Sequence, residues 1–114
     1  MIAKAHHGGQ PLKASAEIVK SFFEAVGHLI PEDATVLLSS EEIDPKSIRT
    51  ALDRLVDFGI APKRGFLLFI DTTPDANWGH DCVYVFLSTG GSVFCRVVDW
   101  PPHESISMTP LKIG

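Results

Sequence analysis

The sequence predicts a small α+β domain in which two helices pack on one face of a mainly antiparallel sheet of three to four strands. Three observations lead to this class: apolar residues recur at helical spacing in the first half, strand-like runs follow Gly65, and a Gly90-Gly91 turn separates two of those runs. The 114 residues are 45% hydrophobic and 21% charged, which is typical of one globular domain with its own core. We therefore expect a single domain over residues 1–114.

The first helix is predicted at about residues 15–29. Ser15 is a suitable N-cap, and Pro31 closes the segment. Residues 1–13 contain two glycines and a proline but no hydrophobic period, so we expect them to form a mobile arm.

The second helix is predicted over residues 44–58. Asp44-Pro45 combines an N-cap with a proline at the first helical position, and Gly59 is a suitable residue to end the helix. The expected buried stripe consists of Ile48, Ala51, Leu52, Leu55 and Val56.

The segment 34–40 is ambiguous, because a short apolar run is compatible with a strand and with a helical turn. Clear strands are predicted at residues 66–70, 82–87 and 93–98, with a weak last strand within 106–113. The strand 82–87 is apolar on both faces, although two helices cover only one. We expect the other face to be covered by the N-terminal arm, by the C-terminal tail or by a second subunit in a homodimer.

A hairpin turning at Gly90-Gly91 has a register in which paired residue numbers sum to 181. That register places Cys82 opposite Asp99 and Cys95 opposite Phe86, so the cysteines lie on one face but roughly 13 Å apart. A disulfide cannot span this distance. Free thiols, together with the lack of a secretory signal pattern or a long apolar run, predict a cytoplasmic protein that does not insert into a membrane.

Polar and aromatic residues gather at the open end of this hairpin, where the loop 71–81 meets the segment 99–104. Loops at the end of a rigid sheet are frequent binding sites. The candidate binding residues are Asp71, Asp75, Trp78, His80, Asp81, Asp99, Trp100 and His103.

One alternative is a thiol or metal-dependent enzyme at His80, Cys82 and Asp99, because a cysteine, a base and an orienting carboxylate form a nucleophilic site. The stretch from His80 to Asp99 resembles part of the transglutaminase-like and papain-like enzymes. In those families the nucleophilic cysteine lies on an earlier helix, and this chain has no cysteine before Cys82. Acidic neighbours also disfavour a reactive thiolate.

A second alternative is nucleic-acid binding, because the apolar spacing over residues 38–60 resembles a winged helix–turn–helix domain. The resemblance implies that helix 44–58 recognises DNA through Lys46, Ser47, Arg49 and Thr50. Residues 41–64 carry five acids and five bases, whereas a DNA-binding face is usually basic.

The chain contains no Gly-rich phosphate loop, nucleophile elbow or clustered metal motif. We therefore predict a non-catalytic binding or regulatory module without a cofactor. It would recognise a protein or peptide through the acidic, aromatic end of its sheet, in preference to nucleic acid.

Overall fold

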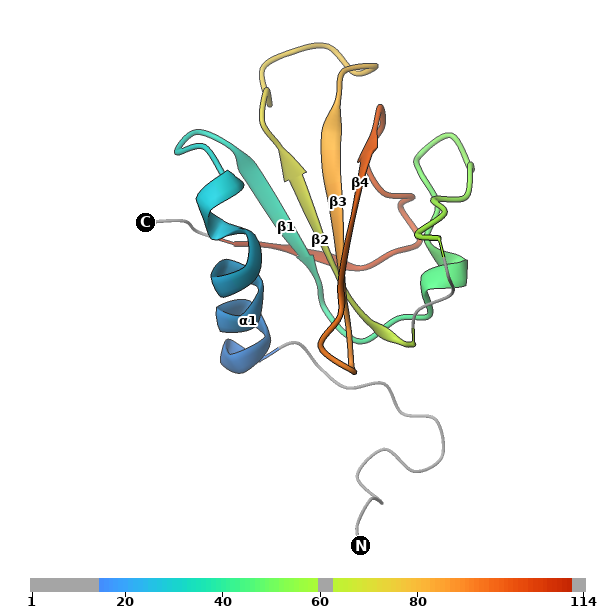
Figure 1. The fold of residues 1–114 in the computed structure, drawn as a ribbon. Coiled ribbons are helices and arrows are strands. Elements are labelled where there is room, and N and C mark those ends of the chain that lie inside the picture. Colours follow the sequence, from blue (N-terminus) through green and yellow to red (C-terminus); the bar gives the residue numbers. More distant parts are fainter. Residues whose placement is uncertain (1–14, 60–62, 112–114) are drawn as a thin grey trace, which may run out of the picture.

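The computed structural model describes residues 15–59 and 63–111, and the arm expected over residues 1–13 lies outside them. One antiparallel five-stranded sheet of order β4-β3-β2-β1-β5 forms the centre of the fold (Figure 1). The elements are the helix α1 (Ala16–Val26), the 3₁₀ turns η2 (Gly27–Leu29) and η3 (Pro45–Ser47), and the strands β1 (Thr35–Ser39), β2 (Gly65–Asp71), β3 (Cys82–Ser88), β4 (Val93–Val98) and β5 (Met108–Pro110). The predicted α+β class is confirmed, but the described residues contain one α-helix where we predicted two, and a sheet of five strands where we predicted three to four.

The first helix forms where the hydrophobic period predicts it. The Ser15 hydroxyl accepts the N–H of Ile18 at 3.4 Å, which satisfies one of the free donors of the first turn. α1 lies against one face of the sheet (Figure 1). Its residues Phe22 and Val26 are buried in a core with Leu68 and Val85.

The ambiguous segment 34–40 is a strand, β1, which pairs with β2 on one side and with β5 on the other. β2 is buried along its whole length, as a continuous apolar run in a central strand requires. The weak last strand is shorter than predicted, because the pairing ends at Pro110. Residue 113 lies outside the described residues.

The predicted hairpin exists, but its register is wrong by one residue. Cys82 pairs with Val98, and Cys95 pairs with Val85. The loop is centred on Gly90 because it contains three residues, and Gly91 takes the left-handed conformation (φ 91°) that closes such a loop. The two cysteines therefore lie on opposite faces of the sheet, and both are free thiols.

The predicted helix 44–58 is wrong beyond its first turn, η3. The backbone groups that a helix would use internally pair with a distant segment: Ala51 N–H donates to Pro101 O, and His103 N–H donates to Arg49 O, both at 2.8 Å. A helix would hold these groups in i→i−4 bonds, so the two arrangements exclude each other.

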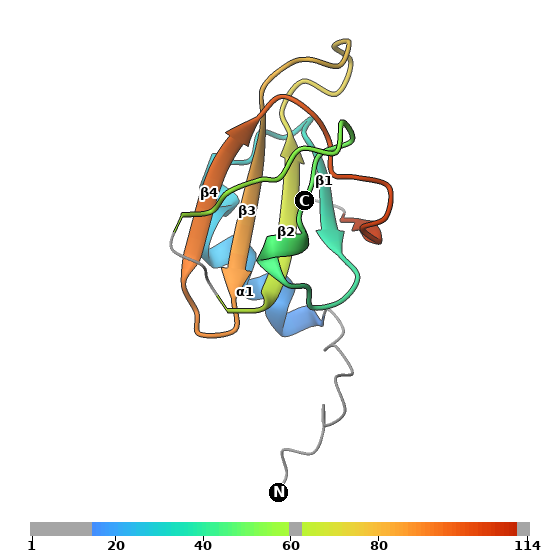
Figure 2. The same ribbon diagram turned by 90° about the vertical axis from the view of Figure 1, so that its right-hand side faces the viewer.

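The second face of the sheet is covered from within the chain (Figure 2). Ile48, Val56 and Phe58 from the irregular segment pack there, with Ile106 and Met108 from the C-terminal segment. The C-terminal tail, one of the three predicted covers, contributes together with residues 43–58, and the N-terminal arm lies outside the described residues. The homodimer was inferred from an uncovered sheet face, and residues of the chain itself pack on this face.

Candidate functional site

The open end of the sheet is organised by a contact between Asp71 and His80. Asp71 ends β2 and is buried, and its Oδ1 lies 2.8 Å from His80 Nε2. The same oxygen accepts the N–H of Thr73 at 3.0 Å. The other ring nitrogen, Nδ1, lies 2.7 Å from the carbonyl oxygen of Asn77. Two contacts to one imidazole thus hold the 72–81 loop against the end of β2.

These contacts favour the protonated imidazole. Both ring nitrogens face acceptors, and only the imidazolium donates at both positions. The pKa of His80 is accordingly raised, first by the hydrogen bond to the Asn77 carbonyl and then by the hydrogen bond to Asp71. His80 therefore bridges two acceptors, and both contacts favour its protonated form.

An aromatic stack extends from this imidazole ring. The rings of His80 and Trp78 are parallel to within 12° with centroids 4.8 Å apart, and Trp78 stacks on Trp100 at 6.4 Å. The backbone of Trp100 is fixed from below, because the buried hydroxyl of Tyr84 donates to its carbonyl oxygen at 2.7 Å. The loop between β2 and β3 and the segment after β4 are thereby joined into one surface.

The thiol of Cys82 lies beneath this stack and donates to the carbonyl oxygen of Val98 at 2.9 Å. Burial raises its pKa to about 12, and the negative charges of Asp71, Asp99 and Asp81 add to the effect. The imidazole of His80 is bonded to Asn77 and Asp71, so it is oriented neither by Asp99 nor toward the thiol. These contacts do not form the nucleophile–base–acid series of the enzyme alternative.

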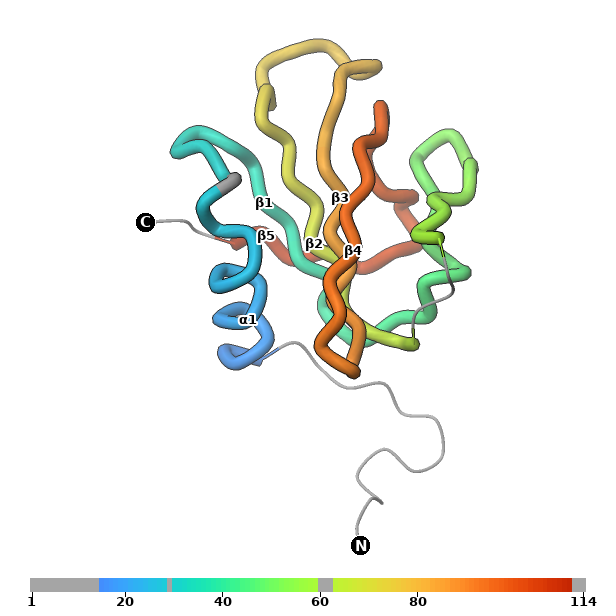
Figure 3. The backbone as a smooth tube through the Cα atoms, viewed as in Figure 1, coloured from blue at the N-terminus to red at the C-terminus, as the bar shows by residue number. Residues whose placement is uncertain are grey.

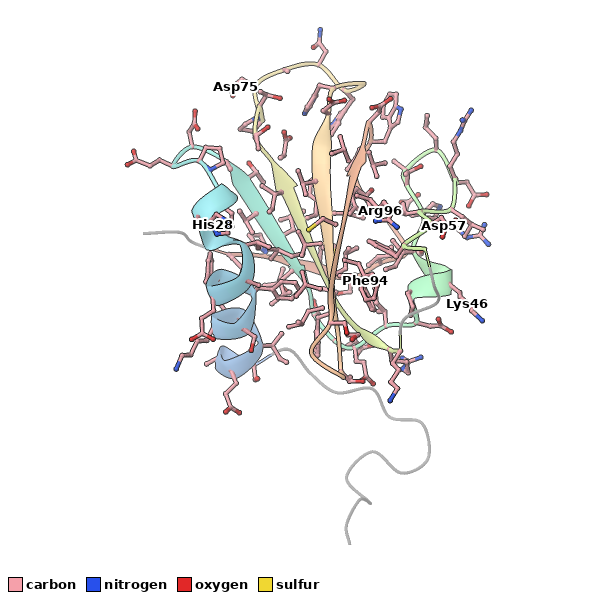
Figure 4. All side chains as sticks on the ribbon, viewed as in Figure 1. His28, Lys46, Asp57, Asp75, Phe94 and Arg96 are labelled. Carbon is pink, nitrogen blue, oxygen red and sulfur yellow. The ribbon has the colours of Figure 1, made fainter. Side chains whose placement is uncertain are left out.

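The predicted site residues separate into three groups. Asp71, Trp78, His80 and Trp100 are in contact through the bonds and stacks above. Asp81 and Asp99 are exposed and flank them, close enough to act on the Cys82 thiol. Asp75 is exposed in the 72–81 loop (Figure 4), and His103 is bonded elsewhere, through its Nδ1 to Ser105 Oγ at 2.9 Å.

A groove beside this surface was not predicted. Residues 50–57 form a loop beside the end of β4, which we call the arch (Figure 3). The arch begins at the bridge between Thr50 and Pro102, and it ends where Arg96 Nε donates to the carbonyl oxygen of Asp57 at 2.7 Å (Figure 4). A cavity of about 440 Å³ lies between the arch and β4.

The groove is lined by both apolar and charged side chains. Its apolar lining includes Leu52, Leu55, Val98 and Trp100, and the two leucines are 51% and 62% exposed. The side chain of Val97 belongs to the other face of the sheet, because Val97 pairs with Val83 of the core beneath α1. Its charged lining consists of Arg54, Asp57, Arg96 and Asp99. No sequence signal pointed to this groove, because the helical interpretation placed both leucines in a buried stripe.

Residues 15–59 and 63–111 contain no group of three or more His, Cys, Asp or Glu side chains placed to hold a metal ion. No helix in this part of the chain is long and apolar enough to cross a membrane. The helix 44–58 that would carry DNA recognition is also missing from the described segment 44–59.

Comparison of the chain with protein-family models, with curated proteins and with solved structures gives no match.

Proposed function

We propose that this chain is a non-catalytic module that binds a protein or peptide through the groove and the adjoining Trp78–Trp100 stack. One observation carries the proposal: five large hydrophobic side chains are exposed in the described residues, and three of them (Leu52, Leu55 and Trp78) lie at the groove or in the adjoining stack. Scattered apolar residues are normal on a surface, but a concentration with a polar rim is typical of an interaction site.

The composition of the surface supports the same proposal. Tryptophan and arginine are enriched among the residues that dominate binding energies, and both border this groove. The Trp78 ring is stacked between the rings of His80 and Trp100, and the Trp100 backbone is held by the Tyr84 hydroxyl, so part of the ordering is complete before a ligand binds. A groove with both apolar and charged lining suits a peptide segment that carries both kinds of side chain.

The absence of a catalytic role is supported by the state of the reactive groups. The His80 nitrogens are both occupied, and the Cys82 thiol is a buried hydrogen-bond donor with a raised pKa. A general base needs a free nitrogen, and a nucleophile needs an accessible thiolate.

The experiment is a selection of random 12-residue peptides displayed on phage against the immobilised full chain. Bound peptides are resynthesised and their affinities are measured by fluorescence anisotropy for the wild type and for a Leu52→Asp/Leu55→Asp variant. Both changed side chains are exposed, so the variant should fold. We expect at least tenfold weaker binding, because charges replace apolar contacts in the groove.

The matched control is Lys20→Asp, which changes an exposed side chain on α1, on the opposite face of the sheet. It should leave the affinity unchanged. If no selected peptide distinguishes the groove variant from this control, the proposed function is wrong.

A further inference from the structure

We propose that this chain forms a homodimer through the edge of its sheet: β4 pairs antiparallel with β4 of a second copy, in a register centred on Cys95. The proposal goes beyond the peptide groove, because it uses the outer edge of β4 and the side chains on the sheet face opposite the groove. Three observations carry it: unpaired backbone groups on this edge, exposed apolar side chains beside them, and the complementarity of the strand with itself.

The outer edge of β4 has backbone groups that await a partner. β4 stands at one end of the sheet order β4-β3-β2-β1-β5 (Figure 2). In an antiparallel ladder, alternate residues bond to the neighbouring strand, and the residues between them direct their N–H and C=O groups away from it. The Ser88 N–H donates to Ser92 O at 2.9 Å, and this bond sets the alternation along β4. The outward-directed residues are Val93, Cys95 and Val97, whose N–H and C=O groups have no backbone partner among residues 15–59 and 63–111.

The opposite edge of the sheet is protected, whereas this one is open. β5 has three residues and ends at Pro110, which has no N–H to offer a further strand. β4 has six residues and contains neither proline nor lysine, which commonly block an exposed edge. The guanidinium of Arg96 donates to the carbonyl oxygens of Cys95 and Asp57, each at 2.7 Å. A carbonyl oxygen has two lone pairs, so Cys95 retains an acceptor position for a partner strand.

Two exposed valines lie along the same edge. Val93 is 38% exposed and Val97 is 66% exposed, and the exposed Cys95 lies between them on one face of the strand. The groove accounts for neither valine. The core beneath α1 includes Val85 of β3 but, within the part of the chain that the structure describes, no residue of β4. A strand added to this edge would place its own side chains against both valines.

The sequence of β4 is complementary to itself in the proposed register. Paired residue numbers sum to 190, so Val93 faces Val97 of the second copy and Phe94 faces Arg96. Each outward-directed residue meets another outward-directed residue, as a hydrogen-bonded ladder requires. The one charged side chain of the strand lies opposite an aromatic ring, which attracts cations, and not opposite its own copy. A two-fold contact needs such self-complementarity, and this identifies a second copy of the chain as the partner.

A contact made by one pair of strands is small. Stable complexes bury about 1,600 Å² in total, and contacts below about 1,200 Å² are typical of transient association. We therefore expect a weak dimer, with a dissociation constant on the order of 100 µM.

The first experiment measures the mass of the full chain by sedimentation equilibrium between 10 µM and 1 mM under reducing conditions. We expect the average mass to rise from 12.4 kDa toward twice this value. Val97→Lys should raise the dissociation constant at least about tenfold, because lysine protects natural sheet edges, and Val97 is exposed, so the variant should fold. Thr109→Lys is the matched control: it adds the same charge at an exposed position of the opposite edge strand and should dimerise like the wild type.

The second experiment tests the register by disulfide exchange. A hydrogen-bonded antiparallel pair has Cα atoms about 5.5 Å apart, within the range that a disulfide spans. In a glutathione buffer, two Cys95 thiols should form one disulfide while one glutathione disulfide is reduced to two glutathione molecules. We expect a covalent dimer on a non-reducing gel, linked through Cys95 and not through Cys82, which is buried on the opposite face of the sheet.

Two variants in a Cys95→Ser background make this test specific. Val93→Cys combined with Val97→Cys places the new thiols opposite each other, so the dimer should be linked from position 93 to position 97. Val93→Cys alone is the control, because the two copies of position 93 are then four residues, or roughly 13 Å, apart along the ladder and cannot be bridged.

A chain that stays at 12.4 kDa up to 1 mM would overturn the proposal. A dimer that is equally tight in Val97→Lys and Thr109→Lys would also overturn it, because the contact would then lie elsewhere. Equal cross-linking of the single and double cysteine variants would indicate random collision in place of a paired edge. Each of these results leaves peptide binding by the groove untouched, so the proposed function stands or fails on its own experiment.

Discussion

His80 Nε2 and Asp71 Oδ1 are 2.8 Å apart across a loop of eight residues, and this contact determines the shape of the open sheet end. The carboxylate is buried at the end of β2, so it needs partners to compensate for its desolvation. The imidazole supplies one partner, and the N–H of Thr73 supplies another. Trp78 then stacks on the imidazole, which places the indole at the surface.

The first prediction concerns pH. The pKa of His80 is raised above 6.5 in the folded chain, so its contribution to stability is fully present below pH 6.5. It is lost as the pH rises through the folded value. We expect the melting-temperature difference between wild type and His80→Gln to be larger at pH 5.5 than at pH 8.5. An NMR titration of the His80 ring should give a pKa above 6.5.

His103→Gln is the control for this measurement, because the His103 ring bonds to Ser105 and contacts no carboxylate of the cluster. The melting-temperature difference between wild type and His103→Gln should not show the same change between pH 5.5 and pH 8.5. A His80 pKa at or below 6.5 would contradict the bridge between Asn77 and Asp71.

The second prediction concerns the thiols. Cys95 is exposed, whereas Cys82 is buried with a pKa raised to about 12. At pH 8 a thiol of pKa 12 is only about one part in ten thousand thiolate, so iodoacetamide should modify Cys82 at least roughly a hundredfold more slowly than Cys95. Mass spectrometry of the native chain should show one label, and urea should expose the second site. Equal labelling rates would reopen the thiol-enzyme alternative.

The third prediction concerns Gly65, where β2 begins against the end of β3. A Cβ at this position would lie 2.0 Å from the carbonyl oxygen of Leu87 and 2.7 Å from the Cα of Ser88, and both are backbone atoms. We expect Gly65→Ala to destabilise the fold by about 3 kcal/mol, measured by urea unfolding, because the strands must separate. Gly90→Ala is the comparison: its nearest contact is 3.8 Å, so the change should be within about 0.5 kcal/mol.

The fourth prediction distinguishes the observed segment 48–58 from a helix. A helical stripe would bury Ile48 and Leu52 together, but Ile48 is fully buried and Leu52 is 51% exposed. Ile48→Ala should therefore cost about 2–5 kcal/mol in urea unfolding, and Leu52→Ala less than about 0.5 kcal/mol. Comparable losses at both positions would indicate a helix.

The candidate site was predictable to the extent that it follows from sheet connectivity. Antiparallel strands bring the loop after β2 and the segment after β4 to the same end, so Asp71, Trp78, His80 and Trp100 were expected to meet. The partner of the His80 ring was not predictable, because the loop 72–81 has no periodic signal. His103 was misplaced for a related reason: its segment turns to pair with Arg49, a tertiary contact without a local pattern.

The sequence by itself determined the class of the fold, the helix α1 and the positions of the main strands, because their hydrophobic periods and caps are local properties. Tertiary structure decided the remainder. The end of β4 continues into a segment that takes the backbone groups of residues 49–51, and this pairing replaces a helix whose local signals were otherwise good. Because residues 49–51 pair with this distant segment, residues 50–57 form the arch beside β4 and do not form a helix. The proposed binding groove therefore depends on a long-range backbone pairing.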